Sequence, residues 1–154
     1  MSTTNTPPSV TTAHPDLHAR IEASFVRQGM MRHLGPRLVS VAPGEVEIAL
    51  PYSERVTQQQ GGYHGGAMGA LADIAAGYAG LTLAADGQEV TTVEYKINFL
   101  AAFSGGELRA RGHVVRAGKR LIITTAEVVH LNDDGGESPC ALMQQTLATV
   151  QQNY

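Results

Sequence analysis

The stretch GGYHGGAMGALADIAAGYAG, residues 61–80, is apolar and rich in glycine, and Asp73 is its single charged side chain. At about 100° per residue, its large side chains fall on one side of a helix and its small ones on another. The large set is Met68, Leu71, Ile74, Tyr78 and Leu81, and the small set is Gly66, Gly69, Ala70, Asp73, Ala76, Gly77 and Gly80. We therefore predict a helix whose large face fills the core and whose small face lets another backbone approach closely.

The surroundings of Asp73 are unusual for a helical aspartate, which is ordinarily a solvent-facing acid on a surface helix. A solvated helix face normally carries several Lys, Glu or Gln side chains, and none lies between Gly65 and Gly80. Asp73 should therefore be partly shielded from water, and a shielded carboxylate is costly unless it is paired or used. This pattern favours a functional acid over a solvated one.

The segment YHGG, residues 63–66, places two glycines at the turn into this helix. The first backbone N–H groups of a helix lack intrahelical partners and lie at the positive end of the dipole, so they can bind an oxyanion. The run lacks GxGxxG and a following Lys-Ser or Lys-Thr, so neither the dinucleotide nor the phosphate-loop motif applies. His64 is open to two interpretations, a catalytic base or a capping residue.

Gly65 and Asp73 are eight residues apart, which corresponds to about 12 Å along one helix axis. They cannot both touch one reacting carbonyl. If two copies set their helices side by side and antiparallel, the Gly65 amide of one chain approaches the Asp73 carboxylate of its mate. The spacing and the small face together predict a symmetric dimer with two composite sites.

The rest of the chain predicts an α+β layout. Residues 16–28 have the spacing of a short amphipathic helix with Asp16 as its cap. Residues 37–41 and 45–50 indicate a hairpin around the turn APGE. The segment EVTTVEYKINFLA, residues 89–101, alternates strictly, which predicts a strand with Val93, Tyr95, Ile97 and Phe99 on its buried side. Residues 107–115, 120–131 and 140–150 then predict a meander, which makes four consecutive antiparallel strands after the long helix.

Composition limits the class of protein. A chain of 154 residues that is 43% hydrophobic can bury one sizeable core, so we expect a loosely ordered tail over residues 1–15 and a single domain over residues 16–154. The net charge of -3 and the scattered Lys and Arg residues argue against a nucleic-acid partner. Cys140 is the only cysteine, which excludes an intrachain disulfide. No export signal and no membrane span are expected, and a cytoplasmic location fits best.

Several motifs together resemble the hotdog-fold acyl-CoA thioesterases, in particular the phenylacetate-degradation (PaaI-like) branch and the related 4-hydroxybenzoyl-CoA thioesterases. The matching features are GGYHGGAMGALAD, TTVEYKINFLAA, GGELRARGHVVRAGKRL and the closing QQTLATV, and they cover roughly residues 34–150. The resemblance implies a long helix wrapped by a curved antiparallel sheet, assembled as a dimer or a dimer of dimers. It implies acyl-CoA as the substrate and no metal or redox cofactor.

Carried over to this chain, the resemblance implies that the Gly65 N–H polarises the thioester carbonyl, with Gly66 beside it in the substrate site. Asp73 from the partner chain then acts as nucleophile or as general base on water, and the second role is favoured. Gln58 matches an Asn or Gln that helps to hold the carbonyl or the water, with Gln59 and Gln60 as alternatives. His64 completes this part of the catalytic set.

Thr92 matches a Ser or Thr that orients the attacking water in one branch of the family. In the other branch a Thr four residues after the acid does this, and here that position is Gly77. Because Gly77 lacks the hydroxyl group of that Thr, Thr92 is the favoured candidate. Strict strand alternation, however, places Thr91, and not Thr92, on the helix side.

Arg116, Lys119 and Arg120 match the basic hairpin that meets the CoA phosphates in the family, and such contacts suit Arg and Lys. An exposed basic turn that keeps the protein soluble is the alternative for each of them. Two other functions remain beside the thioesterase: a hotdog domain that binds acyl-CoA without turnover, and a hotdog hydratase or dehydratase. Retention of Asp73 argues against the first, and the His-acid spacing of the second is not found.

Overall fold

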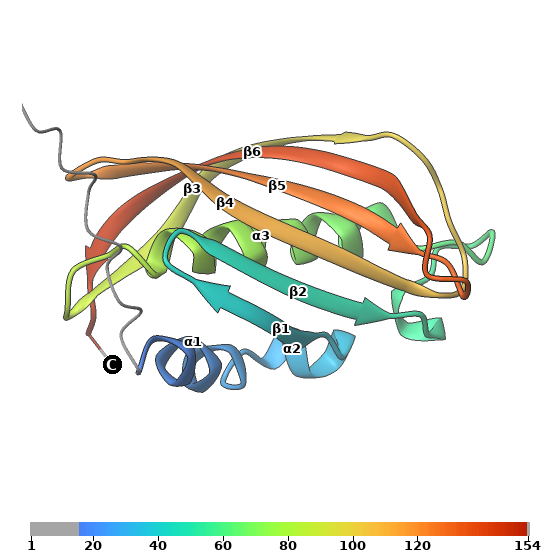
Figure 1. The fold of residues 1–154 in the computed structure, drawn as a ribbon, viewed down its shortest axis with the longest axis horizontal. Coiled ribbons are helices and arrows are strands. Elements are labelled where there is room, and N and C mark those ends of the chain that lie inside the picture. Colours follow the sequence, from blue (N-terminus) through green and yellow to red (C-terminus); the bar gives the residue numbers. More distant parts are fainter. Residues whose placement is uncertain (1–15, 154) are drawn as a thin grey trace, which may run out of the picture.

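The computed structural model describes residues 16–153, and the predicted tail over residues 1–15 lies outside them. The elements are α1 (Leu17–Phe25), α2 (Gly29–Leu34), β1 (Arg37–Ala42), β2 (Glu45–Pro51), the short 3-10 helix η1 (Glu54–Val56), α3 (Gly65–Leu81), β3 (Gln88–Phe99), β4 (Glu107–Ala117), β5 (Leu121–Leu131) and β6 (Glu137–Gln151). Figure 1 shows an antiparallel sheet curving over α3, with α1 and α2 beside β1. A long helix wrapped by an antiparallel sheet was predicted, and both are present.

The helix predicted over residues 16–28 is shorter than expected. α1 ends at Phe25, and Gln28 is extended (φ -73°, ψ 114°) before α2 begins. Asp16 stands at the start of α1, but its side chain makes no capping hydrogen bond. Its backbone carbonyl accepts instead from the Arg20 N–H at 2.8 Å. Asp16 thus occupies the predicted N-cap position, but it caps the helix through its backbone and not through its side chain.

The strand order of the sheet is β1-β2-β4-β5-β6-β3. The predicted β1–β2 hairpin is confirmed, with Gly44 at φ 78° in its turn, a backbone conformation that favours glycine. The predicted meander β4–β5–β6 is also confirmed. However, β3 does not pair with β4, as four consecutive strands would require, but with β6. α3 carries the chain from β2 to the far edge of the sheet, so β3 becomes the last strand.

The predicted burial of one side of β3 is wrong for most of that side. Val93 is 59% exposed, Tyr95 is 46% exposed and Phe99 is 52% exposed, and only Ile97 is half-buried. Two features of β3 account for this: it is the edge strand and pairs with β6 alone, and its pairing shifts between Thr92 and Glu94, which takes Val93 out of the regular alternation. Among the described residues no further strand lies beyond β3.

Several small residues of α3 allow the helix to pack closely against the sheet of the same chain. This corrects the expectation that the small residues all face a second molecule. A Cβ on Gly80 would lie 2.4 Å from Leu147 Cδ1, and a Cβ on Gly112 of β4 would lie 2.3 Å from the carbonyl oxygen of Ala75. Ala76 is fully buried. Among the predicted small-face residues, only Gly66, Ala70, Asp73 and Gly77 are exposed or half-buried.

No helix within residues 16–153 is long and apolar enough to span a membrane.

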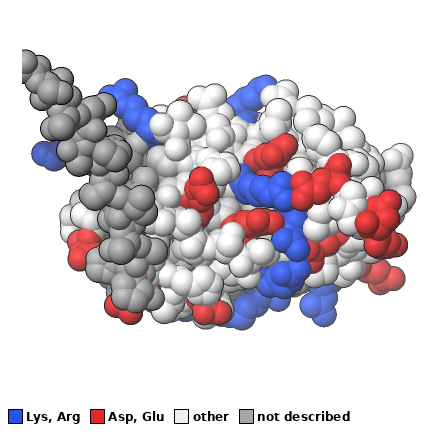
Figure 2. All heavy atoms as spheres, viewed as in Figure 1, with Lys and Arg blue, Asp and Glu red and all other residues white. Residues whose placement is uncertain are grey.

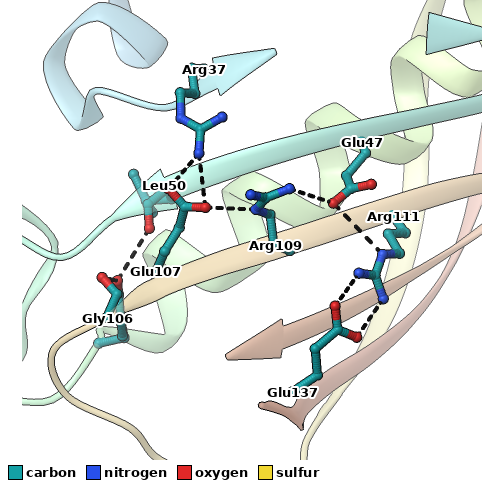
Figure 3. Close-up of polar contacts among 9 residues, drawn as sticks. Arg37, Glu47, Leu50, Gly106, Glu107, Arg109, Arg111 and Glu137 are labelled. Atoms are coloured by element: carbon teal, nitrogen blue, oxygen red, sulfur yellow. Dashed lines mark hydrogen bonds and ion pairs between the residues drawn. The ribbon is translucent and has the colours of Figure 1, made fainter. Parts of the chain in front are cut away.

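Acids and arginines alternate on the outer face of the sheet, where they form the patch of blue and red in Figure 2 and the row of side chains in Figure 3. The row comprises Arg37, Glu107, Arg109, Glu47, Arg111 and Glu137. Arg109 lies 2.6 Å from Glu107 and 2.9 Å from Glu47. Burial opposes ionisation of Glu107, but hydrogen bonds from Arg109 and Arg37 outweigh it and lower the pKa of that carboxyl. These arginines are therefore engaged within the sheet.

Candidate active site

The start of α3 is capped by the side chain of His64. Its Nδ1 accepts a hydrogen bond from the Gly66 N–H at 2.8 Å, and its backbone is extended at the N-cap position. Of the two interpretations of His64, capping is the one for which the structure provides contacts. The cap also occupies the Gly66 amide, so Gly66 is not available as a free donor to a substrate.

The Gly65 N–H remains without an acceptor among the described residues. It points out of the first turn of a helix, where the positive end of the dipole favours an oxyanion. A Cβ on Gly65 would lie 3.2 Å from Cζ of Phe99. The Phe99 ring from the end of β3 therefore lies beside the Cα of Gly65, and glycine provides the space for it.

Gln58 belongs to a tight loop that leads into α3. Its backbone N–H donates to the Gly62 carbonyl at 2.9 Å, and its Oε1 accepts from the Gln60 N–H. The Nε2 of Gln58 faces Gly62, where a Cβ would lie 3.2 Å away. Gln58 is half-buried whereas Gln59 and Gln60 are exposed. Its amide N–H groups find no acceptor among the described residues, which makes Gln58 the candidate donor of the three.

Asp73 is half-buried on α3, and two side chains hydrogen-bond to its Oδ1. The Thr92 hydroxyl donates to it at 2.8 Å, and the Gln145 side-chain amide donates to the same oxygen. Thr92, rather than Thr91, thus faces the helix, which corrects the expectation from strict alternation. The pairing of β3 with β6 shifts between Thr92 and Glu94, and the extra residue of such a bulge reverses the side-chain alternation.

Gln145 and Thr124 are also part of this network, and neither was predicted from the sequence. Gln145 is 1% exposed and Thr124 is fully buried. The Thr124 hydroxyl donates to Gln145 Oε1 at 3.0 Å. The signal was present in β6, where Ala141, Met143 and Leu147 alternate as core residues and Gln145 interrupts them. A lone amide at a core position requires polar partners.

A pocket of about 380 Å³ opens beside Asp73 between α1, α3 and the start of β3. Besides Asp73 and Tyr78, its lining residues on α3, β3 and β6 are Ile74, Gly77, Leu81, Glu89, Val90, Thr92 and Leu147. At α1 its wall is polar, because the Tyr78 hydroxyl accepts from Gln28 Nε2 at 2.6 Å and lies 3.1 Å from Ser24 Oγ. Burial raises the pKa of Tyr78 although both hydrogen bonds oppose the rise, so its hydroxyl remains protonated.

Arg116, Lys119 and Arg120 lie on the exposed hairpin between β4 and β5. None of the three makes an ion pair among the described residues, in contrast to the arginines of the outer row. The Thr149 N–H donates to the Arg120 carbonyl at 3.1 Å, which fixes the hairpin to β6. Val90 of the pocket pairs with Thr149, so the hairpin and the pocket share one end of the sheet.

The remaining histidines of the sheet and the cysteine have structural contacts. His130 Nε2 lies 2.9 Å from the Gly105 carbonyl oxygen, and its ring stacks on Phe103 at 4.5 Å between centroids. His113 lies 3.4 Å from Glu45. Burial raises the pKa of the Cys140 thiol to about 11, which keeps it protonated and unreactive. Within residues 16–153, no three or more His, Cys, Asp or Glu side chains are grouped to hold a metal ion.

Known proteins resemble the chain both in sequence and in structure. Residues 60–137 match the family model described as the thioesterase superfamily. A protein of Saccharolobus solfataricus that carries the name of an esterase is 32% identical over 98 residues, which are 64% of this chain and 69% of the relative. A thioesterase family protein of Silicibacter pomeroyi superposes with a TM-score of 0.84 at 36% identity, over 88% of this chain and 99% of that chain.

The PaaI protein from the phenylacetic acid degradation operon of E. coli superposes with a TM-score of 0.80 at 20% identity, over 92% of this chain and 99% of that chain. That likeness concerns the fold, and it agrees with the antiparallel sheet around α3. The predicted hotdog fold and the predicted resemblance are thereby confirmed. The region that matches the family model contains the α3 entry, Asp73 and Thr92, and on this evidence the chain belongs to the thioesterase superfamily.

Proposed function

We propose that the protein hydrolyses acyl-CoA thioesters to a free carboxylic acid and CoA, and that its active form is a homodimer. The observation that carries the proposal is the anchored carboxylate of Asp73 beside a pocket, on a helix that is otherwise apolar. A superfamily defined by thioester hydrolysis supplies the reaction type. The acyl-CoA substrate and the roles of the residues are the steps beyond it.

In the proposed reaction, the Gly65 N–H of one protomer donates a hydrogen bond to the thioester carbonyl oxygen, with Gln58 Nε2 as the second donor. Asp73 of the partner subunit takes a proton from water as the water oxygen bonds to the carbonyl carbon. The carbonyl electron pair moves to the oxygen that the amide stabilises. When the intermediate collapses, the C–S bond breaks and the proton held by Asp73 passes to the departing thiolate, which gives CoA and the free acid.

The dimer in this proposal is supported by two features of the single chain. Gly65 and Asp73 lie on one helix, eight positions apart and therefore about 12 Å apart along its axis, so one chain does not bring them to the same carbonyl. β3 ends the sheet and presents Val93 and Phe99 to solvent. An exposed edge strand of this kind is a template for pairing with another chain.

The pocket beside Asp73 is the candidate acyl site. Its lining includes the apolar side chains of Ile74, Val90 and Leu147, and an added Cβ on Gly77 would meet no side chain and no other element within 4 Å. The space that a side chain would fill is therefore open to the acyl group. Arg116, Lys119 and Arg120 supply unpaired positive charge at the same end of the sheet, which suits the phosphates of CoA. We further propose that the enzyme works in the cytoplasm without a metal or redox cofactor.

The test is release of CoA thiol from benzoyl-, phenylacetyl-, short-chain and long-chain acyl-CoAs. We expect turnover with at least one of them, and a loss of at least about 100-fold in Asp73→Ala and nearly as much in Asp73→Asn. Asp86→Asn, a change at an exposed aspartate in the loop after α3, is the matched control and should retain full activity.

Each outcome of this assay separates the candidate functions. Full activity in Asp73→Asn contradicts the proposed catalytic role of the Asp73 carboxylate. Tight binding of acyl-CoA without thiol release favours the non-catalytic binding domain. A change in enoyl absorbance with the thioester intact favours the hydratase.

A further inference from the structure

Gln145 occupies a position in β6 that the alternation of the strand assigns to the core. Its neighbours on the same face, Met143 and Leu147, are buried apolar side chains, and Gln145 itself is 1% exposed. A buried amide without hydrogen-bond partners is destabilising, so a chain selected for core packing alone would place an apolar residue here. The contacts of Gln145 indicate what it does instead.

The hydrogen bonds of Gln145 form a chain that leads from Thr124 through the Gln145 amide to Asp73. The Thr124 hydroxyl donates to Gln145 Oε1 at 3.0 Å, which fixes the amide so that its NH2 group faces α3. That NH2 group donates to Asp73 Oδ1 and, at 2.9 Å, to Thr92 Oγ1. Thr92 in turn donates to the same Oδ1 at 2.8 Å. Asp73 Oδ1 is therefore the acceptor on which both side chains converge.

The two oxygens of Asp73 have different surroundings. Oδ1 receives both donors, whereas no described residue donates to Oδ2. The carboxylate is thus held by one oxygen, and the other is left for the pocket that Asp73 lines. A group held in this way loses little freedom when it takes a proton from water.

We propose that Gln145 is a positioning residue for the reaction: it fixes Asp73 through Oδ1 and so leaves Oδ2 as the oxygen that acts on water. This inference rests on the proposed function of Asp73. It assigns the role to a residue that does not itself touch the substrate and that lies 72 positions from Asp73 in the chain.

The first experiment compares Gln145→Met with Gln144→Met by steady-state thiol release. The two substitutions are identical in chemistry, but Gln144 is exposed on the opposite face of β6. We expect kcat to fall about 10- to 100-fold in Gln145→Met with KM changed less than about threefold, because misplacing a reacting group costs rate rather than binding. Gln144→Met should behave as the wild type. Equal effects in the two variants, or a loss confined to KM, would overturn the proposal.

The second experiment separates positioning from a general effect on the fold. If Gln145 acts only through Asp73, then Gln145→Met added to Asp73→Ala should not lower the residual rate further, since the group to be positioned is already gone. A further tenfold loss in the double variant would show a merely structural role. Urea unfolding of each variant checks that the chain is folded under the assay conditions.

Crystal structures of Gln145→Met and Gln144→Met test the positioning without reference to turnover. We expect the Asp73 carboxylate to leave its place against Thr92 in the first and to keep it in the second. An unmoved Asp73 in Gln145→Met contradicts the proposal even if every acyl-CoA is hydrolysed. A wild type that releases no thiol from any substrate would instead defeat the proposed function, and the crystal structures would still decide whether Gln145 holds the carboxylate.

Discussion

Thr92 reaches Asp73 because of one extra residue in β3. A regular strand would direct Thr91 and Val93 toward α3, but the shift in pairing between Thr92 and Glu94 brings the Thr92 hydroxyl to 2.8 Å from Asp73 Oδ1. β-bulges of this kind often re-aim a side chain near an active site. In a regular strand the Thr91 side chain would face α3. Because of the extra residue, the side chain of its neighbour Thr92 faces α3 instead.

We therefore predict that Thr92→Val lowers kcat about 10-fold with the fold retained, because a hydrogen bond to a charged group is worth about 1.5–3 kcal/mol. Thr91→Val is the matched control, since both threonines are exposed on the same strand and the two changes are the same. Thiol release by both variants is the measurement. A loss in Thr91→Val that equals the loss in Thr92→Val would contradict the geometry of the bulge.

At the scale of elements, α3 lies unusually close to β4. The contact is possible because Gly112 has no side chain, and a Cβ there would lie 2.3 Å from the Ala75 carbonyl oxygen. Gly77, on the opposite side of the helix, has open space instead. Small residues on α3 and glycine on the sheet thus set the distance at which the helix that holds Asp73 packs.

The two glycines predict opposite results for the same substitution. Gly112→Ala should lower the free energy of unfolding by about 1–3 kcal/mol, because backbone atoms of α3 must move. Gly77→Ala should raise it by up to about 1 kcal/mol, because alanine favours a helix interior and meets nothing. Urea unfolding of the two variants gives both values. Stabilisation by Gly112→Ala would show that α3 does not approach β4 this closely.

At the scale of the whole molecule, the described chain contains the parts of the proposed site but does not bring them together. Gly65 lies at one end of α3 and Asp73 in its middle, while β3 leaves an open edge with exposed apolar side chains. A second copy paired at this edge would bring Gly65 of one chain to Asp73 of the other and cover the exposed face. The assembly and the activity are therefore coupled in the proposal.

Val93→Lys places a charge on the edge strand, where charges oppose pairing with another chain. We expect this variant to sediment as a monomer and to lose activity, since the two halves of the site no longer meet. Val115→Lys changes an equally exposed valine, 63% accessible against 59%, on the inner strand β4 and should remain dimeric and active. Sedimentation combined with thiol release checks both. An active monomer of the first variant would contradict the composite site.

The sequence by itself determined the local elements. The glycine-rich run predicted α3 because large and small side chains repeat at helical spacing, and a lone acid without solvated neighbours singled out Asp73. The turns and the alternating runs located the strands, and the family resemblance named Thr92. These are properties of neighbours along the chain, so a periodic pattern is enough to indicate them.

Only the tertiary structure decided which strands meet and which side chains meet across them. The pairing of β3 with β6 depends on the path of α3 beneath the sheet, and the bulge that directs Thr92 to Asp73 depends on that pairing. Gln145 came to Asp73 from 72 residues away. Contacts over such separations follow from how the sheet closes over the helix, and no local pattern encodes that geometry.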